Sequence, residues 1–203
     1  MNVAFCILSG GQSRRFNQDK AKAILGNKRL IDYPLELILQ YTDTIYISCQ
    51  YDKTKDRISN ENKDFKAIKI RDEKPFLGPL CGIYYVTKKT DYDYYMFLGL
   101  DMPFITKEMV DELLNEIKDS VYTAAFACND TKMPLPILIS KRAANDFFQK
   151  KDCKNRGIKE LLINRKTKII EWRNCDNLIN INTQEDLQKA EILLTTNYLS
   201  GIS

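Results

Sequence analysis

The chain has 203 residues, of which 44% are hydrophobic and 29% are charged, and this composition fits one compact α/β domain with a sizeable core. Its formal net charge of +4 suits a small anionic ligand and argues against nucleic acid as a partner, because nucleic-acid-binding domains concentrate far more positive charge on one face. No apolar run is long enough to cross a bilayer and no secretory signal pattern is present, so we expect a cytoplasmic protein that does not contact a membrane.

Strand-like and helix-like segments alternate along the chain. In chain order we expect a strand over residues 3–8, a helix over 29–41, a strand over 44–49, a short helix and loop over 51–65, a strand over 67–70, a helix over 82–88, a strand over 94–100, a helix over 106–118, strands over 122–128 and 136–139, and a helix over 183–195. This order predicts a single Rossmann-like α/β domain over residues 1–203, with a doubly wound, mostly parallel sheet flanked by helices. Such sheets bind their ligands at the carboxyl ends of the strands.

The first expected strand leads directly into a glycine-rich, basic segment. Gly10 and Gly11 allow a turn with positive φ that presents backbone N–H groups to an anion. Arg14, Arg15 and Lys20 add positive charge, which a triphosphate needs in several places because no single group can neutralise it. The pattern predicts a phosphate-binding loop; an ordinary turn followed by a basic helix start is the alternative, and Arg15 fits a solvated position equally well.

Two common glycine-rich motifs do not fit this segment. A P-loop lysine follows a glycine and precedes Ser or Thr, whereas Lys20 lies between Asp19 and Ala21, and G-x-G-x-x-G is absent. Residues 8–21, LSGGQSRRFNQDKA, instead resemble the signature L-A-G-G-x-S-x-R-M-G-x-D-K of the molybdenum cofactor guanylyltransferases, with departures at Ser9, Phe16 and Asn17. The resemblance implies a nucleotide-binding loop made of Leu8, Ser9, Gly10, Gly11, Arg14 and Lys20, in which Arg14 and Lys20 act on the phosphates.

A second candidate segment follows the strand expected over 67–70. Asp72 stands at the strand end, and Gly78, Pro79 and Leu80 turn the chain into a helix whose first N–H groups are free. The same turn chemistry would also satisfy a plain loop and helix start. The resemblance implies that Asp72 and the G-P-L-x-G turn surround the base and ribose of the nucleotide.

Asp101 ends an apolar strand and is followed by Met102 and Pro103. A carboxylate at this edge of a sheet can hold Mg²⁺, which keeps several waters and takes its other ligands from phosphates. The family pattern x-x-D-x-P implies the same role for Asp101 as magnesium ligand. An Asp that caps the next helix is the alternative, although Thr106 is better placed as that cap.

The acceptor side of the expected site is less clearly marked. Asn180 and Asn182 share one face of an extended segment before the last helix, and paired amides there can hydrogen-bond a pterin. The family carries a similar N-x-N-T stretch, but Asn in a turn before a helix is an equally good interpretation of the residues. Arg156 lies where the family has a loop for the second substrate, which implies a contact with the phosphate of the pterin; a surface charge is the alternative.

Together these residues predict an enzyme that transfers GMP from GTP to molybdopterin with Mg²⁺ and releases pyrophosphate, without a covalent enzyme intermediate. We expect a nucleotide-binding half over about residues 1–105 and an acceptor-binding half over about residues 106–203. The resemblance also implies cofactor-insertion proteins and apo-molybdoenzymes as partners. Two alternatives stay open: a nucleotidyltransferase for another nucleotide or acceptor, of the cytidylyl or sugar-phosphate type, and a nucleotide-binding module that delivers a cofactor without catalysis.

The sequence contains no histidine, which excludes Ser-His and Cys-His catalysis and histidine-based metal sites. Carboxylates, lysines, arginines and backbone amides remain for the chemistry. The six cysteines form no C-x-x-C pair, so in a cytosolic chain we expect free thiols and neither disulfides nor zinc ligands.

Overall fold

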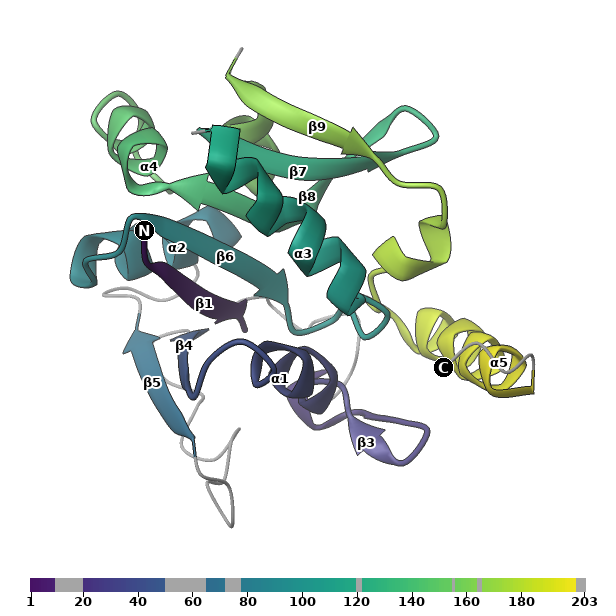
Figure 1. Ribbon diagram of the computed structural model, residues 1–203. Coiled ribbons are helices and arrows are strands. Elements are labelled where there is room, and N and C mark those ends of the chain that lie inside the picture. Colours follow the sequence, from purple (N-terminus) through teal and green to yellow (C-terminus); the bar gives the residue numbers. More distant parts are fainter. Residues whose placement is uncertain are drawn as a thin grey trace.

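The computed structural model describes residues 1–9, 20–49, 65–71, 78–119, 122–154, 156–163 and 166–199. Its main feature is a seven-stranded sheet in the order β5-β4-β1-β6-β8-β7-β9 (Figure 1). The strands are β1 (Val3–Leu8), β4 (Thr44–Cys49), β5 (Lys66–Arg71), β6 (Tyr94–Gly99), β7 (Thr123–Cys128), β8 (Thr131–Ser140) and β9 (Thr167–Glu171). Only β8 is antiparallel to its neighbours within this sheet, so the predicted mostly parallel α/β sheet is confirmed.

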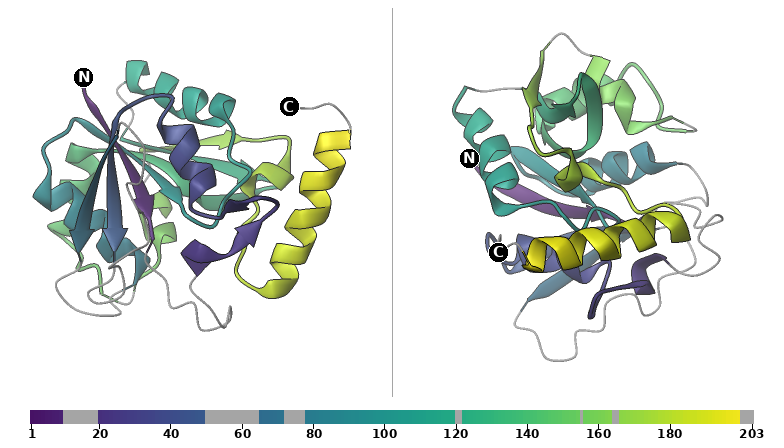
Figure 2. Two further views of the ribbon diagram at one scale, coloured as in Figure 1. Left: turned by 90° about the horizontal axis from the view of Figure 1, so that it is seen from below. Right: turned by 90° about the vertical axis from the view of Figure 1, so that its right-hand side faces the viewer.

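The helices form a layer on each face of the sheet. They are α1 (Asp32–Ile38), α2 (Pro79–Lys89), α3 (Lys107–Asn115), α4 (Lys141–Phe148) and α5 (Gln184–Leu199). Figures 1 and 2 show α1 and α3 over one face and α2 and α4 over the other, while α5 lies beside the sheet against a small hairpin of β2 (Ile24–Leu25) and β3 (Lys28–Arg29). None of the described helices is long and apolar enough to span a membrane.

The sequence explains where the strands lie in the sheet. β1, β6 and β7 are almost continuous apolar runs, and every residue of β6 and β7 is buried, as expected for strands covered by helices on both faces. Aromatic side chains fill the centre, among them the fully buried Tyr95, Phe97 and Phe126. This core places the carboxyl ends of β1, β4 and β6 side by side.

The helix starts follow ordinary capping chemistry. The Thr106 hydroxyl oxygen accepts a hydrogen bond from the Met109 N–H at 3.4 Å, which confirms Thr106 as the cap of α3. Before α5, the Thr183 hydroxyl oxygen accepts from the Asp186 N–H at 3.0 Å, and the Asp186 carboxylate accepts in return from the Thr183 N–H at 2.9 Å. This reciprocal pair is a capping box, and it fixes the chain just before α5.

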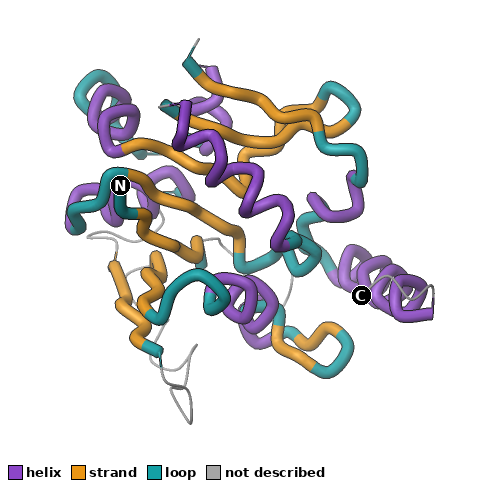
Figure 3. Tube along the Cα trace, viewed as in Figure 1, coloured by secondary structure: helices purple, strands orange, loops and turns teal. Residues whose placement is uncertain are grey.

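Several boundaries differ from the expected ones. The helix expected over 29–41 is shorter, because residues 28–29 pair with β2 through a turn at Gly26, whose φ is +60°; Figure 3 separates this hairpin from the helix that follows. The strand expected over 136–139 is the ten-residue β8, and α4 and β9 were not expected. The helix and loop expected over 51–65 lie almost wholly outside the described residues.

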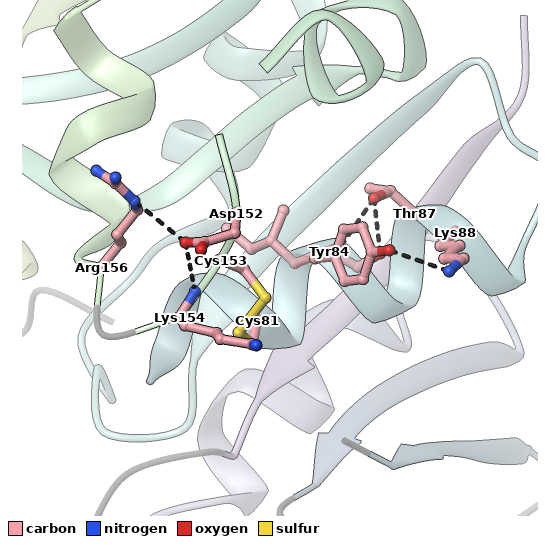
Figure 4. Close-up of a disulfide and its surroundings, with 9 residues drawn as sticks. Cys81, Tyr84, Thr87, Lys88, Asp152, Cys153, Lys154 and Arg156 are labelled. Carbon is pink, nitrogen blue, oxygen red and sulfur yellow. Dashed lines mark hydrogen bonds and ion pairs between the residues drawn. A yellow bond between two sulfur atoms is a disulfide. The ribbon is translucent and has the colours of Figure 1, made fainter. Parts of the chain in front are cut away.

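The expectation for the cysteines is wrong for four of the six. Cys81 pairs with Cys153 and Cys128 pairs with Cys175, whereas Cys6 and Cys49 are buried and form no disulfide among the described residues. Burial raises the pKa of Cys6 well above its ordinary value. The paired residues are 72 and 47 positions apart in the sequence, so spacing alone could not reveal them. Figure 4 shows Cys153 bonded to Cys81 in the first turn of α2.

Candidate active site

Leu8 and Ser9 lie at the carboxyl edge of the sheet, directly before the glycine-rich segment. The Ser9 N–H donates to the Ser48 carbonyl at 3.1 Å, and the Leu100 N–H donates to the Leu8 carbonyl at 3.3 Å. Ser9 is buried, so the chain leaves β1 from a fixed position between β4 and β6. The predicted loop residues Gly10, Gly11 and Arg14 lie outside the described residues, as does Arg15.

Asp101 lies in the turn that follows β6, and a glycine makes room for its carboxylate. A Cβ atom at Gly99 would lie 2.6 Å from Asp101 Oδ1, closer than such atoms approach in proteins, and 3.2 Å from Met102 Cγ, which is a tight contact. The turn is closed by the Met102 N–H, which donates to the Gly99 carbonyl at 3.4 Å. The carboxylate is 23% exposed, so it is fixed by its neighbours and still reachable from solvent.

Lys20 provides the positive charge at this edge. Its ammonium group donates to Asp101 Oδ2 at 2.7 Å and to Asn182 Oδ1 at 2.9 Å, and the side chain is only 13% exposed. The residue begins a 3-10 helix, Lys20–Lys22, and its carbonyl accepts from the Ala23 N–H at 3.3 Å. We call Lys20, Asp101 and Asn182 the edge triad. Residues 81 and 162 positions away from Lys20 therefore meet it in one site.

The segment that carries Asn182 is held to Asp101 through the backbone. The Ile181 N–H donates to the Asp101 carbonyl at 2.9 Å, and the Asn182 N–H donates to the Asp186 carboxylate at 2.9 Å. Burial raises the pKa of Asp186, but hydrogen bonds from Asn182 and Thr183 outweigh this effect and hold its pKa below the ordinary value. The capping box thus fixes Asn182 as well as α5.

A small hydrophobic cluster joins the segment after Lys20 to the segment before Asn182. It is separate from the main core and consists of Ala23, Leu25, Leu30, Ile181 and Ala190. The Gly26 N–H adds a hydrogen bond to the Glu191 carboxylate of α5 at 2.8 Å. These contacts position the backbone on both sides of the triad.

Asn180 has a different environment from Asn182. Its Oδ1 atom is buried and has no hydrogen-bond partner within the part of the chain that the structure describes. An amide oxygen of this kind can accept from a ligand donor, since a buried polar atom is costly to leave unpaired. Asn180 and Asn182 therefore have different contacts among the described residues: Asn182 accepts a hydrogen bond from Lys20, and the Asn180 Oδ1 atom has no partner there.

The first turn of α2 lies close to the same edge. Gly78 has a φ of +90° and precedes Pro79 at the first helical position, as the turn pattern predicts. A Cβ at Gly82 would meet Ser48 Oγ and lie 3.1 Å from Leu8 Cδ2, so α2 packs closely on the ends of β1 and β4. Within this first turn the Cys81 N–H donates to the Gly78 carbonyl at 3.2 Å. Asp72 lies outside the described residues.

Arg156 is balanced by acidic neighbours. Its guanidinium group lies 2.7 Å from Glu160 Oε2 and 3.5 Å from Asp152 Oδ1, and the hydrogen bond to Glu160 raises its pKa. Figure 4 shows Arg156 next to Asp152, one residue from the Cys153 disulfide. No contact with the edge triad is recorded for Arg156 among the described residues.

The sequence analysis did not identify two features of this site. Gly99 carries no motif of its own, and only the position of the Asp101 carboxylate shows why it matters. For Asp186, the spacing Thr183-x-x-Asp186 is the signal that could have identified the capping box and hence the fixed position of Asn182.

The triad combines a cation, a carboxylate and an amide, which suits a phosphate-transfer site. Among the described residues, no group of three or more His, Cys, Asp or Glu side chains could hold a metal ion. A metal at Asp101 would therefore depend on ligands from waters and phosphates, which is how Mg²⁺ is usually bound in nucleotide enzymes.

Comparison with known proteins supports this chemistry. Residues 5–168 match the family model described as a MobA-like NTP transferase domain. The molybdenum cofactor guanylyltransferase of Haemophilus influenzae is 26% identical over 196 residues, covering 95% of this chain and 99% of that protein. A probable molybdenum cofactor guanylyltransferase of Flavobacterium johnsoniae is 26% identical over 194 residues, covering 93% and 96%. The crystal structure of molybdopterin-guanine dinucleotide biosynthesis protein A from Archaeoglobus fulgidus has the same fold, with a TM-score of 0.77, 21% identity and coverage of 95% and 99%.

Proposed function

The chain belongs to the family of MobA-like NTP transferase domains, and from this premise we propose that it transfers GMP from GTP to molybdopterin, with release of pyrophosphate. The family membership confirms the resemblance seen in residues 8–21 and makes the chain a nucleotidyltransferase. The names of the relatives at 26% identity support guanine as the base and molybdopterin as the acceptor.

The observation that carries the proposal is the contact of Lys20 with Asp101 at the carboxyl edge of β1 and β6. Attack of the acceptor phosphate on the α-phosphorus of GTP needs no covalent enzyme intermediate, so positioning and charge neutralisation provide the rate enhancement. Lys20 would donate to phosphate oxygens and offset the charge on the departing pyrophosphate. Arg14 and the backbone N–H groups of Gly10 and Gly11 are proposed to share this role.

We propose that Asp101 holds a divalent cation, with Mg²⁺ as the ion used. The carboxylate is suited to bind a cation, because it is partly exposed and its Oδ1 atom accepts no hydrogen bond from the described residues. A bound divalent cation would neutralise phosphate charge and favour departure of the pyrophosphate. Gly99 keeps the space in which the carboxylate lies, and the Ile181 N–H holds its backbone.

The remaining contacts are assigned to the two substrates. Leu8, Ser9, Asp72 and the turn Gly78, Pro79, Leu80 are proposed to bind the nucleotide. Asn180 is proposed to accept a hydrogen bond from the donor-rich pterin ring, which its unpaired Oδ1 atom supports. Arg156 is proposed to meet the phosphate of the pterin, which requires it to exchange Glu160 for that phosphate.

A substrate panel tests the proposal directly. Each of the four nucleoside triphosphates is incubated with Mg²⁺ and either molybdopterin or a sugar 1-phosphate, and pyrophosphate and the joined product are both measured. Pyrophosphate release with GTP and molybdopterin alone supports the proposal. Release with CTP or with the sugar phosphate identifies a different nucleotidyl transfer, and nucleotide binding without release indicates a delivery module.

A further inference from the structure

Lys20 contacts the carboxylate of Asp101, which the proposed function assigns as the ligand of a metal ion. Its ammonium group lies 2.7 Å from Asp101 Oδ2, and its side chain is 13% exposed, so this is a well-enclosed contact and differs from a mobile surface pair. A second acceptor, Asn182 Oδ1, holds the ammonium group from another side at 2.9 Å.

We propose that Lys20 and the divalent cation are competing partners of Asp101, and that Asn182 is the positioning residue that keeps Lys20 on Asp101 until a nucleotide binds. This inference rests on the proposed function, because it concerns how the same site takes up its metal. It also predicts an order of binding: the metal ion and the nucleotide bind together, and the protein without nucleotide binds the metal ion poorly.

Electrostatics supports the competition. A single carboxylate cannot neutralise an ammonium group and a divalent cation at once, and two positive charges that share one carboxylate repel each other. Within the described residues no group of three acidic or other ligating side chains lies nearby to compensate. A triphosphate changes this balance, because its oxygens can accept from Lys20 and also complete the coordination of the metal.

The choice of an amide as the second partner of Lys20 fits the same scheme. Asn182 is neutral, so its hydrogen bond directs the ammonium group without adding a charge that would hold it there when phosphate arrives. Its backbone is fixed by Asp186 and by the neighbouring Ile181, so the amide does not need to move when Lys20 does.

The test is a titration with Mn²⁺, whose unbound fraction is measured by electron paramagnetic resonance, on the full chain without nucleotide or acceptor. The variants are Lys20→Met and Asn182→Ala. Lys22→Met is the matched control, because it removes the same charge from an exposed position of the same 3-10 helix. The double variant Lys20→Met with Asp101→Asn shows whether any gain in affinity belongs to Asp101. Circular dichroism confirms that each variant is folded.

We expect Lys20→Met to bind Mn²⁺ at least tenfold more tightly than the parent, Asn182→Ala to fall between them, and Lys22→Met to match the parent. The gain should vanish in the double variant. Equal affinities for Lys20→Met and the parent, or a gain that survives Asp101→Asn, would overturn the proposal. Either result leaves the proposed function standing, because guanylyl transfer is measured separately with GTP and molybdopterin.

Discussion

Replacing Gly99 with alanine tests whether the position of the Asp101 carboxylate determines activity. The new Cβ would lie 2.6 Å from Asp101 Oδ1 and 3.2 Å from Met102 Cγ, so the carboxylate must move away from its present position. An added methyl group in a packed region forces neighbouring side chains off their rotamers, at a total cost of about 1–3 kcal/mol. We therefore expect a folded protein that is less stable by about 1–3 kcal/mol.

The loss of activity should be larger than this loss of stability implies. A displacement of about 1 Å at a reacting centre can lower the rate about a hundredfold, because the rate depends on alignment. The assay is steady-state guanylyl transfer at a temperature where the variant is fully folded, together with thermal unfolding of each protein. We expect kcat/KM to fall about a hundredfold in Gly99→Ala.

Gly157→Ala is the matched control, because a Cβ there would have no atom within 4 Å. It makes the same chemical change without a steric conflict, so its stability should equal that of the parent. If folded Gly99→Ala keeps the activity of the parent, the position of the Asp101 carboxylate does not limit the reaction. A similar loss of stability in Gly157→Ala would also refute the reasoning, since the cost in Gly99→Ala would then not come from the contact with Asp101.

Three further substitutions separate charge, metal binding and local stability. Lys20→Ala should keep the fold but lower guanylyl transfer by about two to three orders of magnitude, as for other lost charge-stabilising donors; unchanged turnover would remove Lys20 from the reaction. Asp101→Asn should raise the magnesium concentration needed for half-maximal rate, because an amide is a poorer ligand for a hard cation; an unchanged magnesium midpoint and turnover would leave Asp101 a structural residue. Asp186→Ala should lower the free energy of unfolding by about 1 kcal/mol near neutral pH. Because the folded-state pKa of Asp186 is depressed, its contribution to stability is present above the ordinary carboxyl pKa and is lost as pH falls through the folded-state value. Thermal unfolding should therefore show a smaller difference in stability between Asp186→Ala and the parent in acid than near neutral pH. An equal difference in acid and near neutral pH would contradict this.

The fold was largely predictable because the apolar runs of β1, β4 and β6 are buried from both sides and show little competing periodicity. The strand expected over 136–139 was too short because Pro134 and Pro136 interrupt the pattern, although β8 continues through both. The short helix α4 begins at a Ser140 cap and spans only eight residues, fewer than the window in which a helical period is recognised. Its existence depends on packing, which a local pattern does not contain.

One contact of the candidate site was predictable from the sequence, and another was not. The motif identified Lys20 and Asp101, and the topology brings them together because β1 and β6 are neighbours whose carboxyl ends meet. The contact between Lys20 and Asn182 was not predicted, because the sequence places Asn182 in a segment of the acceptor half. Both amides are predicted to face the pterin, and among the described residues the Asn180 Oδ1 atom has no hydrogen-bond partner, whereas Asn182 Oδ1 accepts from Lys20.

The small cluster beside the sheet explains how such distant residues can stay aligned. Ala23 and Leu25 follow Lys20, Ile181 precedes Asn182, and all three pack in the same apolar cluster. The large core positions Asp101 through β6, whereas this second cluster positions the other two members of the edge triad. Two separate packing units therefore meet at one ion pair, and the hydrogen bond from the Ile181 N–H to the Asp101 carbonyl joins them. The hairpin and α5, which contribute no strand to the main sheet, are thus part of the positioning of the site.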